Sequence, residues 1–246
     1  YSGLDLQEAV TYYANVKALD LAGNESEVVS GDGIIIDQSG PIPGSISDGD
    51  MADIDWVNIN YLSVGNWTGF TDSLSGIGEY EYSLGLSPGQ TQVVSWTSAN
   101  LDTTITVSAS LTEGPTYYAN VRAVDSVSNV GSHISSDGYG LDVSAPITGN
   151  VYDGLGGDLT WTNIIDSIWA NWEGFSDLYS GISFYETAVG TSPGGQNTVS
   201  WVSADTNIST SHAELSLEHG STYYFSVRAT DVVDNVSSTG TSNGIT

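Results

Sequence analysis

Residues 117–125 read YYANVRAVD, and this stretch decides the fold. Apolar or small residues occupy every second position from Tyr117 to Ala123, which predicts an extended strand with one apolar face. The stretch recurs as YYANVKALD at 12–20 and as YYFSVRATD at 223–231. The copies are spaced 105 and 106 residues apart, so the chain is a tandem repeat.

Other aromatic residues and glycines keep the 105-residue spacing. They are Trp56 and Trp161, Trp67 and Trp172, Gly69 and Gly174, Tyr80 and Tyr185, and Trp96 and Trp201. The repeats are separated by DQSGP at 37–41 and DVSAP at 142–146. Because proline fixes φ and cannot continue a strand ladder, we interpret both segments as short, stiff linkers.

This spacing predicts three parts of the chain. Residues 40–144 and 145–246 each form a complete repeat, whereas residues 1–39 hold only the C-terminal strands of an incomplete preceding repeat. Two explanations of the incomplete repeat stay open. The chain is a fragment of a longer array, or strands of another subunit complete residues 1–39.

Each repeat is predicted to be all-β. Short runs rich in Val, Ile, Thr, Tyr and Trp alternate with Gly, Asp, Ser and Asn, and no stretch of helical periodicity interrupts them. In the first repeat we expect strands at 44–47, 61–67, 77–84, 93–97, 104–111, 116–125 and 133–141, with a second set 105 residues later. About seven strands in about 105 residues is typical of an immunoglobulin-like sandwich.

Specific residues resemble fibronectin type III domains. Leu111, Gly114 and Tyr117 match the spacing of that family's tyrosine corner, and Leu217 to Tyr223 repeats it. Trp67 resembles the family's second-strand tryptophan and is expected between the sheets, as is Trp172. The resemblance implies tandem seven-stranded immunoglobulin-like sandwiches in a large extracellular surface protein, and modules that usually are not enzymes.

The charge of the chain excludes several partners. Its 246 residues hold 3 Lys+Arg against 30 Asp+Glu, for a formal net charge of −27. Nucleic acid and anionic membrane surfaces both require clustered cations, so neither is an expected partner. With no cysteine the fold has no disulfide framework and must depend on packing or on bound ions.

Aspartates gather in two places where they are candidate Ca²⁺ ligands. Compact carboxylates in loops are the oxygen donors that Ca²⁺ takes, although the EF-hand loop pattern is absent. Turn capping and an acidic, solubilising surface are the alternative explanation. The candidate ligands are Asp48, Asp50, Asp53 and Asp55 in the first loop, and Asp142 with Asp177 around the linker.

The three cations occupy one register of the repeat: Lys17, Arg122 and Arg228. In this fold the sixth strand lies beside the third, so we predict cross-strand ion pairs of Arg122 with Glu81 and of Arg228 with Glu186. Three residues after each cation, an aspartate begins a hairpin that also holds an asparagine four residues later. We interpret these Asp–Asn pairs as structural because both side chains can bond turn amides. The pairs are Asp20 with Asn24, Asp125 with Asn129, and Asp231 with Asn235.

These observations predict a stalk, adhesin or surface-fibre segment that provides reach and mechanical stiffness without catalysis. Neighbouring repeats, and like subunits in a fibre, are the expected partners. The alternative is an accessory or carbohydrate-binding module of a secreted polysaccharide-degrading enzyme. In that case outward-facing aromatics such as Tyr118 would stack on surface glycans.

Overall fold

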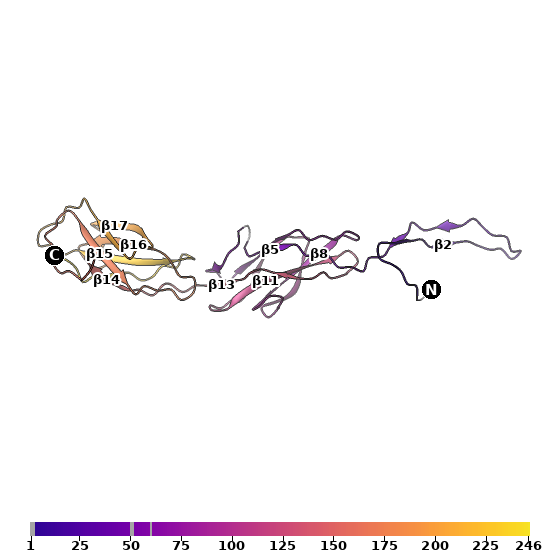
Figure 1. The fold of residues 1–246 in the computed structure, drawn as a ribbon, viewed down its shortest axis with the longest axis horizontal. Coiled ribbons are helices and arrows are strands. Elements are labelled where there is room, and N and C mark those ends of the chain that lie inside the picture. The colour runs from indigo at the N-terminus through magenta and orange to yellow at the C-terminus, as the bar shows by residue number, and fades with distance from the viewer. Residues whose placement is uncertain (1–2, 50–51, 60) are drawn as a thin grey trace. The chain divides into compact units, whose positions relative to one another are not determined.

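A computed structural model describes residues 3–49, 52–59 and 61–246, and Figure 1 shows its ribbon. These residues form strands, turns and loops and contain no helix, so the all-β prediction is confirmed. In particular, no helix of the described part is long and apolar enough to cross a membrane.

The chain divides into two compact units. One unit comprises residues 1–53, 63–107 and 118–138, and the other comprises 54–62, 108–117 and 139–246. The division passes through three strands of the first repeat, β7 (Tyr61–Thr68), β10 (Thr104–Ser108) and β11 (Thr116–Asp125). The predicted domain boundaries, at the linkers, stay a prediction.

The first unit begins with paired short strands. β1 (Thr11–Tyr12) pairs with β4 (Ile34–Ile35), and β2 (Asn15–Val16) pairs with β3 (Val29–Ser30), both antiparallel. No second sheet covers them among the residues of this unit that the structure describes, and Val16 and Val29 are 68% and 71% exposed. An isolated two-stranded ribbon has marginal stability.

The remaining strands of the first unit form parts of two sheets. β5 (Ser45–Ser47) pairs with β7, which β10 joins on its other side. β8 (Ile77–Gly85) lies between β9 (Val94–Asn100) and the Tyr118–Asp125 part of β11, while β12 (Ile134–Ser135) also pairs with β11. The third and sixth predicted strands, β8 and β11, are therefore neighbours as expected.

The second unit holds a complete sandwich. One sheet has the order β14-β15-β18 and the other the order β17-β16-β19-β20. Their bounds are β14 Asn150–Asp153, β15 Ile168–Glu173, β16 Ile182–Gly190, β17 Val199–Asp205, β18 Ser209–His212, β19 Tyr224–Asp231 and β20 Gly240–Thr241. The unit also includes β6 (Trp56–Val57), which pairs in parallel with β13 (Tyr139–Leu141).

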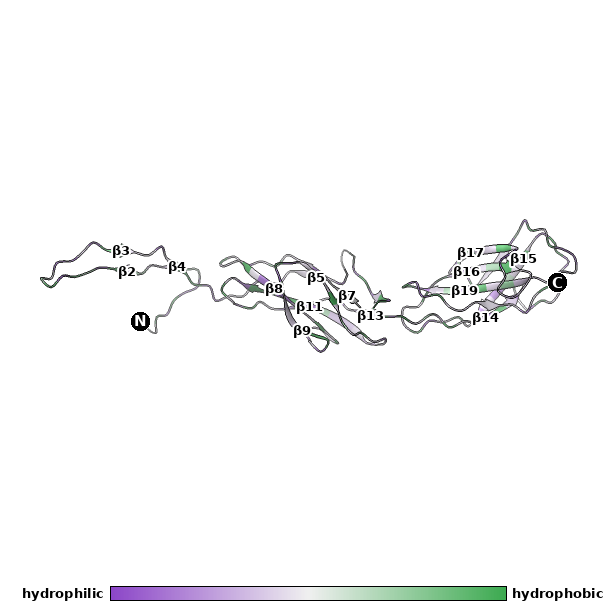
Figure 2. Ribbon diagram, turned by 180° about the vertical axis from the view of Figure 1, so that it is seen from behind, coloured by the Kyte–Doolittle hydropathy of each residue, from purple (hydrophilic) through white to green (hydrophobic). Residues whose placement is uncertain are grey.

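Alternating side chains build the cores. Trp172, Phe225 and Val227 are at most 1% exposed and belong to one apolar cluster with residues of both sheets of the second sandwich. In the first unit Trp67 is 2% exposed and its ring meets Tyr80 edge to face, at 5.9 Å between centroids. Both tryptophans are buried as predicted, and Figure 2 shows hydrophobic residues interspersed with polar ones along these strands.

Two of the strands predicted in the first repeat are shortened or divided in the structure. The run 104–111 ends at Ser108, because residues 111–117 turn to form the tyrosine corner, in which the Tyr117 hydroxyl accepts from the Thr112 N–H at 2.8 Å. The run 133–141 is divided into β12 and β13, since Gly138 adopts a φ of 97° between them. This left-handed conformation favours glycine over residues with a Cβ atom.

The tyrosine corner occurs in all three copies. Besides Tyr117, the hydroxyls of Tyr12 and Tyr223 accept from the backbone N–H groups of Gln7 and Glu218, each at 2.8 Å. Each bond satisfies a loop amide and fixes the loop that precedes the tyrosine.

We expect the Tyr223→Phe variant to unfold more easily than the wild type, by about 1 to 2 kcal/mol, because the Glu218 N–H loses its acceptor inside the fold. Urea denaturation followed by tryptophan fluorescence measures this loss. Tyr224→Phe, at the adjacent residue that begins β19, is the matched control. Equal stability of the two variants would show that the corner bond contributes nothing.

Candidate metal centres

Both arginines are held between a carboxylate and an indole. Arg122 Nε lies 2.7 Å from Glu81 Oε2, and its guanidinium carbon lies 4.3 Å from the ring centroid of Trp96. The predicted cross-strand ion pair is confirmed, whereas the cation–π contact was not foreseen. In both strand pairs the arginine is engaged from two sides, which leaves it poorly placed to attract an anionic ligand.

The second repeat reproduces this arrangement. Arg228 Nε lies 2.7 Å from Glu186 Oε2, and Trp201 contacts the guanidinium at 4.4 Å. Within residues 1–39, Lys17 instead pairs with Glu25 at 2.7 Å. Each of the three cations of the chain therefore already has a carboxylate partner, so the other acidic residues must be stabilised in other ways.

The Asp–Asn hairpins are structural, as predicted. In the three copies an aspartate Oδ1 accepts the backbone N–H of the asparagine four residues later at 2.8 Å, and the asparagine amide donates to Oδ2 at 2.7 to 2.8 Å. The pairs are Asp20 with Asn24, Asp125 with Asn129, and Asp231 with Asn235. These bonds lower the pKa of Asp20 and contribute to lowering that of Asp125, whose burial opposes them.

One carboxylate cluster surrounds the linker at residues 142–146. Asp142, Asp177 and Asp231 each place a carboxylate oxygen within 4.8 Å of the others. The structure thus brings together Asp142 and Asp177, which the sequence had paired, and adds Asp231 from the hairpin. Asp37, Asp72 and Asp125 form the same cluster one repeat earlier.

Backbone amides satisfy these linker carboxylates. Asp142 Oδ1 accepts from the Ser144 N–H at 3.1 Å and Oδ2 from the Ser180 N–H at 3.0 Å. Asp177 Oδ1 accepts from two amides of its own loop. The amide of Asn235 also donates to the Asp142 carbonyl at 3.2 Å. The cluster therefore anchors the linker to the repeat that follows it.

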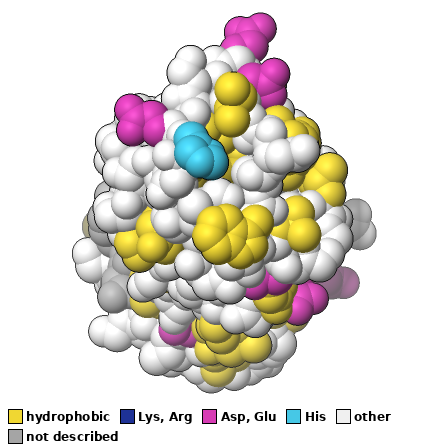
Figure 3. Space-filling view, turned by 90° about the vertical axis from the view of Figure 1, so that its left-hand side faces the viewer, with side chains coloured by type: hydrophobic (Ala, Val, Ile, Leu, Met, Phe, Trp, Pro, Cys, Tyr) yellow, Lys and Arg dark blue, Asp and Glu magenta, His cyan; other side chains and the backbone are white. Residues whose placement is uncertain are grey.

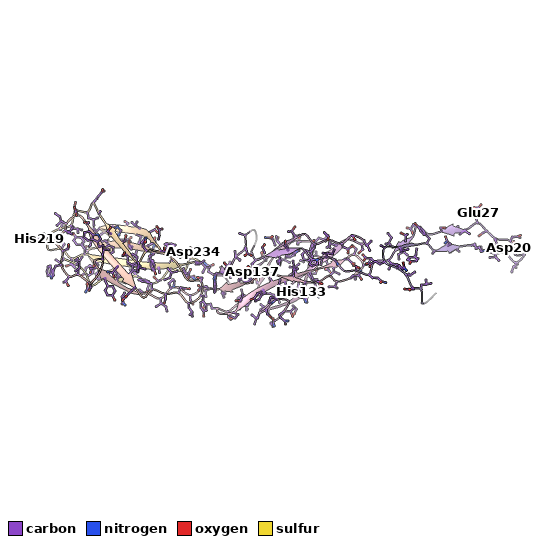
Figure 4. The ribbon with its side chains drawn as sticks, in the orientation of Figure 1. Asp20, Glu27, His133, Asp137, His219 and Asp234 are labelled. Atoms are coloured by element: carbon purple, nitrogen blue, oxygen red, sulfur yellow. The ribbon has the colours of Figure 1, made fainter. Side chains whose placement is uncertain are left out.

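A different cluster lies in the first loop of the first repeat. Asp48, Asp53 and Asp137 each offer a carboxylate oxygen within 4.8 Å of the others, and Figure 4 labels Asp137. Asp48 is 0% exposed, and its Oδ2 accepts from the Gly138 N–H at 3.0 Å. Its Oδ1 is buried and has no hydrogen-bond partner. Burial, reinforced by the charges of Asp137 and Asp53, raises the pKa of Asp48 to about 6.

The sequence predicted this loop only in part. Of its four aspartates, Asp48 and Asp53 come together, Asp50 lies outside the described residues, and Asp55 is exposed and belongs to none of the three clusters. Asp137 was missed because it follows 84 residues after Asp53. Its position in the repeat, beside the glycine that precedes β13, was the available signal.

The second repeat holds a related loop. Asp153 is 0% exposed, its Oδ2 accepts from the Gly244 N–H at 3.1 Å, and its Oδ1 is buried without a partner. Asp158 takes the position of Asp53, and Asn243 takes that of Asp137 and donates to Asp158 at 2.8 Å. Burial again raises the pKa of the inner carboxyl, Asp153, to about 6.

Comparisons with known proteins find similar solved structures only at low sequence identity. No protein-family model matches the chain, and no curated protein does. Among solved structures, it is similar to the FN1–FN3 domains of chicken CNTN1, at 15% identity and a TM-score of 0.43 over 97% of this chain and 76% of that one. It is also similar to domains A168–A170 of titin, at 15% identity and a TM-score of 0.48 over 95% and 74%.

Because Asp153 is buried, we expect the folding stability of the chain to depend on pH. Its folded pKa, about 6, lies above the ordinary value of 3.8, so the folded chain holds more protons than the unfolded chain between these values. Stability is therefore lost as pH rises from about 4 to about 6. In the presence of a chelator, Asp153→Asn removes the charge, and we expect it to be more stable than the wild type at pH 7.5 by roughly 1 to 3 kcal/mol.

The advantage of Asp153→Asn should shrink as pH falls below 6 and vanish near about pH 3, where the wild-type carboxyl is protonated in both states. Differential scanning calorimetry across this pH range measures the effect. Asp102→Asn, at an exposed position, is the control that removes a charge without burial. A difference between wild type and Asp153→Asn that does not change with pH would contradict the prediction.

Proposed function

We propose that this chain is a segment of an extracellular stalk, adhesin or surface fibre, in which tandem fibronectin type III-like sandwiches provide reach and stiffness. The observation that carries the proposal is the anchoring of both linkers. Asp37 and Asp142 each accept a backbone N–H of the following repeat at 3.0 Å, and their carbonyls each accept an asparagine amide at 3.2 Å. Repeated anchoring of this kind limits the freedom of the linkers.

The linker at 142–146 is also bonded on its other side. The Asp142 N–H donates to the Val57 carbonyl at 2.8 Å. Glu113 accepts from the Val143 N–H at 2.7 Å and from the Ser144 hydroxyl at 2.9 Å. Val57 and Glu113 belong to the first repeat, so hydrogen bonds from both repeats hold these three linker residues. Pro146 adds a fixed φ.

Mechanical resistance follows from the ladders. When the ends of an antiparallel sandwich are pulled, hydrogen bonds between strands must break before the chain can extend, and pairs such as β16 with β19 provide many of them. A net charge of −27 keeps such segments soluble, in accord with an extracellular location. Neighbouring repeats of the array, and like subunits in a fibre, are the partners that this role requires.

A carbohydrate-binding accessory module is the second candidate function, and one observation favours it. Trp161 is 73% exposed and lines a pocket with Ile165 and Tyr223 at the end of the second repeat. Figure 3 views that end of the chain and shows hydrophobic side chains on its surface beside carboxylates. An exposed indole beside an apolar hollow is a surface on which a sugar ring can stack.

Glycan-array binding tests the second candidate. If it is correct, the wild-type chain binds a defined set of polysaccharides and Trp161→Ala loses that binding. Tyr118→Ala, at the outward-facing tyrosine of the first repeat, is the companion variant. No bound glycan would leave the stalk as the only function supported, whereas binding that survives both substitutions would place the glycan site elsewhere.

The stiffness of the linker can be measured directly, since the chain has no cysteine. Spin labels at Ser95→Cys and Ser200→Cys occupy exposed, equivalent positions on β9 and β17. Pulsed dipolar spectroscopy should give one narrow distance distribution. Substituting Glu113→Ala together with Asn235→Ala should broaden it severalfold, because the linker loses bonds on both sides.

Glu218→Ala is the matched control for the linker experiment, since Glu218 takes the position of Glu113 in the second repeat and lies away from the linker at 142–146. It should leave the distribution narrow. A wild-type distribution as broad as that of the double variant would contradict the proposed stiffness.

A further inference from the structure

The buried carboxylate of Asp48 lacks a counter-charge. Its Oδ2 accepts from the Gly138 N–H, and its Oδ1 is buried and makes no hydrogen bond. The Ser136 hydroxyl interacts with this carboxylate, but it is neutral and supplies no counter-charge. Burying an unpartnered polar atom costs on the order of 1 to 3 kcal/mol, and more when the group is charged. A ligand of opposite charge bound beside Asp48 Oδ1 would offset this cost.

The neighbours of Asp48 make the ligand a cation. Asp53 and Asp137 bring two more carboxylate oxygens within 4.8 Å, so three acidic groups converge on one volume. The arginine of this repeat is engaged elsewhere, with Glu81 and Trp96. Carboxylates at this distance repel one another strongly when one of them is buried. A cation bound between them attracts all three and outweighs that repulsion.

We infer that Asp48, Asp53 and Asp137 bind one Ca²⁺ ion in the first repeat. The donor set consists of oxygen only, which selects a hard cation over zinc or copper. Ca²⁺ accepts six to eight oxygens in a flexible arrangement, while Mg²⁺ demands a near-ideal octahedron and retains several waters. Asp53 and Asp137 are exposed, so water can complete the coordination of the larger ion.

The second repeat provides an internal comparison. Asp153 has the same buried, unpartnered Oδ1, and Asp158 stands beside it. Asn243 replaces the third carboxylate, and its amide already donates to Asp158 Oδ2 at 2.8 Å. With one negative charge fewer and both oxygens of Asp158 engaged in hydrogen bonds, this loop binds Ca²⁺ more weakly than the first.

The carboxylates of the two linker clusters differ from Asp48 in their hydrogen bonding. Asp142 and Asp177, like Asp37 and Asp72, accept backbone N–H groups. Amides therefore already compensate these carboxylates, as they do not for Asp48 Oδ1. The inference is confined to the first-loop site, and Ca²⁺ at Asp142 and Asp177 stays a prediction of the sequence. It also does not depend on the stalk function, since the site lies within one repeat.

Calorimetric titration of the chelator-treated full chain with CaCl₂ tests the inference, with melting temperature in the presence of Ca²⁺ as a second readout. The wild type should bind Ca²⁺ and melt at a higher temperature with it. Asp48→Asn should lose one equivalent of bound Ca²⁺ and the matching part of the thermal shift. Asp137→Asn, at an exposed position and therefore harmless to folding, should weaken binding at that site at least tenfold.

The second repeat supplies the reciprocal variant. Asn243→Asp restores the third carboxylate and should tighten Ca²⁺ binding by Asp153 and Asp158 at least tenfold. The inference is overturned if the wild type binds no Ca²⁺, or if Asp48→Asn and Asp137→Asn both bind it as the wild type does. Equal affinity for MgCl₂ would overturn the assignment of calcium.

Discussion

Antiparallel pairing of the third and sixth strands of each repeat is the interaction on which the structure depends. β8 with β11, and β16 with β19, place small and apolar residues on one face and an Arg–Glu pair on the other. The inner face packs on Trp67 or Trp172, which the opposite sheet contributes. A register shift by one residue would expose this face and bury the arginine, so the pairing is strongly specified.

The same strand pairing also positions the hairpins whose aspartates meet the linkers. The hairpin after β11 presents Asp125 to Asp37, and the hairpin after β19 presents Asp231 to Asp142. In each case the linker is tied to a strand end that the core has already positioned. The other end of the first sandwich presents Asp137 to Asp48. Acidic residues thus gather where loops meet, at the positions from which stiffness and ion binding would arise.

Much of this could be predicted from sequence because it is local and repeated. Alternation within residues 117–125 and the 105-residue spacing predict the strands, and the neighbouring order of the third and sixth strands then predicts the Arg122–Glu81 pair. The stacking of Trp96 on Arg122 could not be predicted, because it depends on the register of a third strand. Asp137 and Asp231 were missed as cluster members because loop ends meet only after the sheets pack.

The proposed function requires that each 105-residue repeat is a separate sandwich that bears load in series with its neighbours. Stretching the full chain between two handles in an optical trap tests it most directly. The account predicts two separate unfolding steps, each of which releases about 35 nm of contour length, the extended length of about 105 residues. A single step that releases the whole chain, or gradual extension without any step, would contradict it.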